Sequence, residues 1–81
     1  MTYYIRWNHG DDAAVRAIYQ AQSGKKEQEA IQEAPMDSGT EYMVGTERID
    51  DFVMTALTGK APSLRLYKAY PKDFVQKVEK E

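Results

Sequence analysis

Cysteine is absent from the 81-residue sequence, and histidine occurs once, as His9. The first absence excludes disulfide bonds, thiolate metal sites and a cysteine nucleophile. A single histidine cannot supply the pair of imidazoles found in common zinc sites. A glycine-rich phosphate-binding loop is also missing. We therefore expect no metal, no cofactor and no catalytic residues.

Long hydrophobic runs are missing as well. No apolar run is long enough to span a bilayer, so we expect no association with a membrane. Residues 1–12 lack the basic flank and the continuous apolar stretch of a signal peptide. These two absences favour a cytoplasmic location.

The overall composition is that of a globular protein. Hydrophobic residues make up 42% of the chain and charged residues 30%, close to the averages for folded domains. No repeat or linker divides the sequence, so we expect a single domain over residues 1–81. The net charge of −2 argues against a dedicated nucleic-acid binder, because such proteins usually carry a basic excess that contacts phosphate.

Alternating side chains predict strands. Residues 2–7 and 63–70 are rich in tyrosine, leucine and isoleucine and have a period of two. This period directs Ile5 and Leu66 to the interior and leaves the intervening side chains on the other face. Residues 41–45 predict a third, short strand.

Helical spacing predicts two amphipathic helices, over residues 12–23 and 47–58. Thr46 is the expected N-cap of the second helix. The apolar stripe expected to face the core in that helix consists of Ile49, Phe52, Val53, Ala56 and Leu57.

Two further segments have helix-forming composition. Residues 25–34 contain one large apolar side chain, Ile31, and predict either a second, solvated helix or an extension of the first. Pro35 ends this segment. Pro71 suits the first position of a closing helix over residues 71–79.

The fold class that follows is α+β. The economical architecture is a three-stranded sheet with the helices packed mainly on one face, which leaves the other face largely open to water. A sheet this small also makes a homodimer an option, since pairing would cover an edge or a face.

The open face of the predicted sheet holds the first candidate site. If the first and last strands are neighbours, Tyr4, Arg6, Arg65 and Tyr67 share one exposed surface. Tyrosine and arginine are enriched at protein-binding hot spots, and aromatic rings beside guanidinium groups also stack bases and contact phosphate. The ordinary alternative is cross-strand pairing with no role in binding.

A second candidate is acidic. Glu47, Asp50 and Asp51 lie at the start of the predicted helix 47–58, where negative charge complements the helix dipole. Such a group is also able to bind a basic partner.

The third candidate is the turn at residues 8–12. His9 could act as a general base oriented by Asp11, or bind a divalent ion together with Asp11 and Asp12. A turn followed by an aspartate helix cap explains every residue of this segment except His9.

These observations favour a small non-enzymatic interaction protein, an adaptor, regulator or inhibitor that binds a protein partner. The alternatives are a nucleic-acid-binding module that uses the Tyr/Arg face, and a minimal enzyme or metal protein centred on His9.

Overall fold

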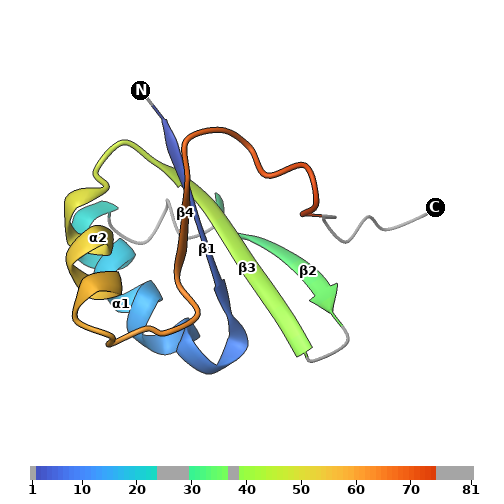
Figure 1. Cartoon of the computed structure of the whole chain (residues 1–81), viewed down its shortest axis with the longest axis horizontal. Coiled ribbons are helices and arrows are strands. Elements are labelled where there is room, and N and C mark those ends of the chain that lie inside the picture. The colour runs from blue at the N-terminus through green and yellow to red at the C-terminus, as the bar shows by residue number, and fades with distance from the viewer. Residues whose placement is uncertain (1, 24–29, 37–38, 75–81) are drawn as a thin grey trace.

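Four strands and two α-helices make up most of the part of the chain that the computed structural model describes, residues 2–23, 30–36 and 39–74. In chain order (Figure 1) the elements are β1 (Tyr3–Asn8), the 3-10 turn η1 (His9–Asp11), α1 (Asp12–Ser23), β2 (Gln32–Met36), β3 (Gly39–Thr46), α2 (Asp50–Leu57) and β4 (Arg65–Tyr67).

The strands form one antiparallel sheet in the order β2-β3-β1-β4. The hairpin β2–β3 joins the two halves of the chain. In the sheet, α1 connects β1 to β2 across β3, and α2 connects β3 to β4 across β1. This strand and helix order is that of the ferredoxin-like split βαβ motif. The central strand β1 pairs with β3 on one side and with β4 on the other, so both neighbours fix its register.

Several predicted elements are confirmed. The strand at residues 2–7 and the helix at residues 12–23 match β1 and α1. The predicted helix at residues 47–58 is α2, which begins three residues later, at Asp50. Thr46 does not cap it; the Thr46 hydroxyl instead accepts a hydrogen bond of 3.1 Å from the backbone N–H of Arg48.

The prediction of three strands is wrong by one. The segment 25–34 was expected to be helical, but Gln32–Met36 is strand β2; residues 24–29 lie outside the described part. Pairing with β3 overrides the helical composition, because Ala34 lies opposite Glu41 and is buried there. Pro35 is tolerated because β2 is an edge strand.

The C-terminal predictions also need correction. Strand β4 spans three residues rather than the expected 63–70. The helix expected at 71–79 does not begin at Pro71, since residues 71–74 form a turn in which Phe74 N–H donates to the Pro71 carbonyl at 3.0 Å. The rest of that predicted helix lies outside the described residues.

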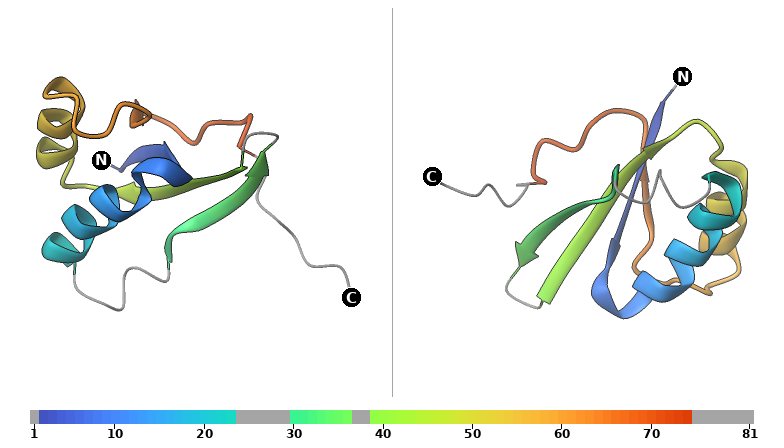
Figure 2. Two further views of the ribbon diagram at one scale, coloured as in Figure 1. Left: turned by 90° about the horizontal axis from the view of Figure 1, so that it is seen from below. Right: turned by 180° about the vertical axis from the view of Figure 1, so that it is seen from behind.

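The main core lies between the sheet and the two helices, which stand next to each other on one side of it (Figures 1 and 2). Ile5 and Trp7 of β1 point into this core, as their alternation predicted. Phe52 of α2 and Val15 of α1 pack against them. Trp7 also donates its Nε1–H to Asp12 Oδ1 at 2.9 Å, which ties the sheet to the first turn of α1.

The opposite face of the sheet, here called the second face, is not open as expected. After β4 the chain turns away from the helices toward the β2 side of the sheet (Figure 1). Residues 70–74, here called the C-terminal segment, lie across the second face. Phe74 joins Ala34 and Met43 in a second buried cluster, against which Tyr4 packs.

Candidate protein-binding surfaces

The strand register brings together the four residues of the predicted Tyr/Arg site. Tyr4 lies opposite Tyr67, and Arg6 lies opposite Arg65. Residues that are direct partners in an antiparallel pair project from the same face, so all four belong to the second face. Their common location is therefore confirmed, although the expectation that both arginines face water is wrong.

Arg6 is buried, with 2% of its surface exposed. Its Nε and Nη2 donate to the two carboxylate oxygens of Glu41, the latter at 3.4 Å, and its Nη1 lies 2.9 Å from both oxygens of Asp73. The Phe74 ring covers the guanidinium, with its centroid 5.3 Å from Arg6 Cζ. Arg65, whose side chain is partly exposed, also donates to Glu41. Two positive charges thus face two negative charges, so this network carries no net charge.

The pKa values of the network reflect these contacts. Burial lowers the pKa of Arg6, but hydrogen bonds to Glu41 and Asp73 and the charges of both carboxylates outweigh it, so the pKa is raised above its ordinary value. The hydrogen bond from Arg6 lowers the pKa of Asp73. Both groups are therefore charged at neutral pH.

The acidic group lies elsewhere. Asp50 and Asp51 occupy the first turn of α2, and Glu47 precedes them. Since α2 packs against the helix-covered face of the sheet, this group does not form one surface with the Tyr/Arg site. Gln22 of α1 donates to Asp51 Oδ2 at 2.9 Å, which links the two helices at this point.

An exposed apolar stripe on α2 was missed in the sequence. Met54 is 59% exposed and Leu57 is 77% exposed. Successive residues of a helix are about 100° apart, so Leu57 lies about 140° around from Phe52, and its assignment to the core stripe is wrong. The same geometry aligns Asp50, Met54 and Leu57 at positions i, i+4 and i+7. That spacing was the signal available in the sequence.

A groove runs from this stripe to α1. It has a volume of about 500 Å³ and is lined by Ala14, Ile18, Ala21, Asp51, Met54, Thr55 and Lys60. Among the α1 residues whose burial is described, the exposed ones are Ala13, Ala14, Ala17, Gln20 and Ala21, none of which is charged. Together with Met54 and Leu57 they are here called the helical surface; the charged residues Asp51 and Lys60 also line its groove.

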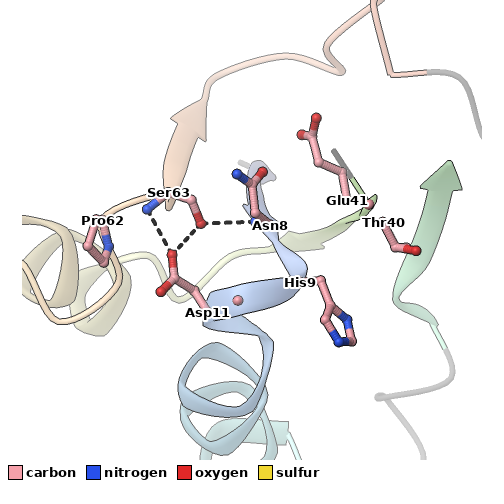
Figure 3. A pocket seen from close by; sticks show the side chains of 9 residues that line it. Asn8, His9, Asp11, Thr40, Glu41, Pro62 and Ser63 are labelled. Carbon is pink, nitrogen blue, oxygen red and sulfur yellow. Dashed lines mark hydrogen bonds between the residues drawn. The ribbon is translucent and has the colours of Figure 1, made fainter. Parts of the chain in front are cut away.

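The largest groove among these sites lies around His9, with a volume of about 650 Å³ (Figure 3). Asp11 does not orient His9: its carboxylate accepts hydrogen bonds from the backbone N–H and the hydroxyl of Ser63, the former at 2.9 Å. His9 Nδ1 lies 3.0 Å from the Tyr42 hydroxyl instead. In Figure 3 the imidazole points away from Ser63 and Asp11.

The chemistry of the His9 groove is limited by these contacts. Burial raises the pKa of Tyr42, helped by the charges of Asp12 and Glu33, so its hydroxyl remains protonated at neutral pH. Within the described ranges, no three histidine, cysteine or acidic side chains are arranged to hold a metal ion. The groove therefore brings together hydrogen-bonding groups, among them the Ser63 hydroxyl that donates to the Asp11 carboxylate.

Comparisons with known proteins add no identification: no protein-family model, no curated protein and no solved structure matches this chain. None of the helices in residues 2–23, 30–36 and 39–74 is long and apolar enough to cross a membrane.

Proposed function

We propose that this protein is a small non-enzymatic interaction protein that binds a protein partner through its helical surface. The observation that carries the proposal is the exposure of Met54 and Leu57, 59% and 77%, on one stripe of α2. Single exposed apolar residues are common on monomers, but a contiguous apolar patch beside a groove is typical of interaction sites.

Burial of these two side chains supplies a driving force for binding. Full burial of a leucine or methionine side chain is worth about 1.5–3 kcal/mol. Both residues are on a regular helix next to α1, so a partner meets a surface that is already ordered. Pre-ordering reduces the entropy lost on binding.

Charge around the patch indicates the chemistry of the partner. Asp50 begins the exposed stripe and is exposed itself, and no ion pair of Asp50 is found in the described part of the chain. Asp51 contacts the neutral amide of Gln22. A partner segment that places apolar side chains on Met54 and Leu57 and a basic side chain near Asp50 complements both features.

The test uses a photo-crosslinking residue at position 57, introduced into the full chain in the cell that produces it. The matched control carries the same residue at position 33, which is also exposed but lies on the edge strand β2, outside the helical surface. A distinct protein captured from position 57 and not from position 33 is the expected result. Its affinity should then fall at least about tenfold for Leu57→Asp, equivalent to about 1.4 kcal/mol.

Two results would contradict the proposal. Equal capture from both positions would show that the helical surface is not a specific site. A crosslink to a second copy of the chain would assign the surface to a homodimer instead, which a size measurement in solution would show independently.

The alternatives remain predictions with weaker support. Nucleic-acid binding through the Tyr/Arg site needs cationic groups free to meet phosphate, whereas Arg6 and Arg65 both donate to Glu41. Catalysis with His9 as a general base oriented by Asp11 lacks that contact, because Asp11 accepts from Ser63 and His9 Nδ1 lies beside the Tyr42 hydroxyl. Salt-sensitive binding of an oligonucleotide that is lost in Arg65→Ala would favour the first alternative.

A further inference from the structure

The C-terminal segment covers the second face without becoming part of the sheet. Within the described residues, its one backbone hydrogen bond joins Phe74 to Pro71, inside the segment itself. Side chains make all its attachments to the sheet. The Tyr70 hydroxyl donates to Gln32 Oε1 at 3.1 Å, and the Tyr70 ring meets Tyr4 edge-on at 5.5 Å.

The remaining attachments converge on one guanidinium. Asp73 accepts from Arg6 Nη1 with both oxygens, and the adjacent Phe74 ring lies against Arg6 Cζ. The Asp73 side chain is 72% exposed, whereas Phe74 is 4% exposed and fills the space over Met43 and Ala34. An acidic residue followed by an aromatic residue therefore occupies a site formed by the sheet.

The sheet holds this site in place independently of the segment. Glu41 of β3 accepts from both Nε and Nη2 of Arg6, which fixes the plane of the guanidinium and leaves Nη1 directed at Asp73. Without Asp73, the two arginines and Glu41 leave one net positive charge, which is the complement of a single carboxylate.

We propose that the second face is a binding site for a peptide segment of a protein partner that carries an acidic residue followed by an aromatic residue, and that the chain's own Asp73 and Phe74 occupy this site in the free protein. A partner peptide binds only when the C-terminal segment is displaced. Its apparent affinity is therefore its affinity for the open site multiplied by the fraction of molecules in which the site is open. This surface is separate from the helical surface, and either proposal stands or fails without the other.

The experiment compares two full-length proteins, wild type and the double variant Asp73→Asn with Phe74→Ala, for binding of a fluorescent synthetic peptide with the sequence of residues 68–74. Lys72→Ala, an exposed change in the same segment, is the matched control. We expect the double variant to bind the peptide at least tenfold more tightly than wild type and Lys72→Ala. A peptide in which its own aspartate and phenylalanine are replaced by asparagine and alanine should lose this binding.

Trp7 fluorescence and circular dichroism establish whether the double variant is folded. An unfolded double variant would overturn the proposal, since the C-terminal segment would then be an integral part of the core. Equal affinity of all three proteins, or no detectable binding to the folded double variant, would also overturn it. A dimer of the wild-type protein that Phe74→Ala abolishes would also overturn the proposal, because it would assign the second face to a second copy of the chain.

Discussion

Replacing Glu41 by glutamine tests the buried ion network directly. Glutamine keeps the size of the side chain but removes the charge that faces Arg6 and Arg65. The Arg6 guanidinium cannot respond by losing its proton, because the ordinary pKa of an arginine side chain lies far above neutral pH. The variant therefore keeps a buried positive charge. The glutamine side chain also has an NH2 group, which is a hydrogen-bond donor, in place of one of the two carboxylate oxygens that accept from the arginines.

The size of the effect follows from the burial of the pair. Removing one partner of a buried ion pair destabilises a protein by about 3–5 kcal/mol. Asp73 still contacts Arg6, so we expect the lower end, a loss of about 3 kcal/mol in the free energy of unfolding. A domain of this length is stable by about 4–12 kcal/mol, so the variant should keep about 1–9 kcal/mol and remain folded in the absence of urea.

Urea unfolding followed by Trp7, the one tryptophan of the chain, measures this loss. With a slope of about 1 kcal/mol per molar urea, the midpoint should fall by about 3 M. Glu33→Gln is the matched control, because Glu33 is an exposed glutamate on the same sheet, and its free energy of unfolding should change by less than about 0.5 kcal/mol. Equal midpoints for the two variants would refute the view that the network is removed from water.

Three other changes probe different parts of the molecule. Asp12→Ala removes the acceptor of the Trp7 indole N–H, so the free energy of unfolding should fall by about 1–3 kcal/mol; an unchanged unfolding midpoint would contradict this. Phe52→Ala should lower it by about 3–5 kcal/mol, whereas Leu57→Ala should change it by less than about 0.5 kcal/mol; comparable losses in urea titrations would mean that the faces of α2 are wrongly assigned. Asp73 has a lowered pKa in the folded protein, so its contact with Arg6 stabilises the fold above the ordinary carboxyl pKa of about 3.9, and this stabilisation is lost as the pH falls through the folded value. The thermal midpoint of Asp73→Asn should therefore depend less on pH than that of wild type between about pH 5 and about pH 2. Parallel pH profiles for the two proteins would exclude the ion pair.

Local patterns in the sequence predicted the elements that bury one clear face. The alternation around Ile5 and Trp7 identified β1 and its inward side, because a strand with one buried face has a period of two. The spacing of Val15 and Tyr19 identified α1 for the corresponding reason. In both elements the hydrophobic period and the local propensity agree.

The remaining features depend on contacts between distant residues. Strand β2 has helical composition, and its pairing with β3 determines its conformation. Arg6 was assigned to the correct face, but its burial depends on Asp73 and Phe74, which follow 67 and 68 residues later. The turn at residues 71–74 shows no periodicity from which this covering of the second face could have been predicted.

The two proposed surfaces differ in what must happen before a partner binds. The helical surface is exposed on helices that share the main core, so association there needs no rearrangement, and its rate should lie in the ordinary range of about 10⁵–10⁷ M⁻¹s⁻¹. Binding at the second face must wait until Phe74 leaves its cluster with Met43. Stopped-flow measurements of the peptide from residues 68–74 should therefore show an observed rate that levels off with peptide concentration for wild type. The variant Asp73→Asn with Phe74→Ala should show a linear increase, because its site is already open; a linear increase for wild type as well would mean that the C-terminal segment does not control access to the second face.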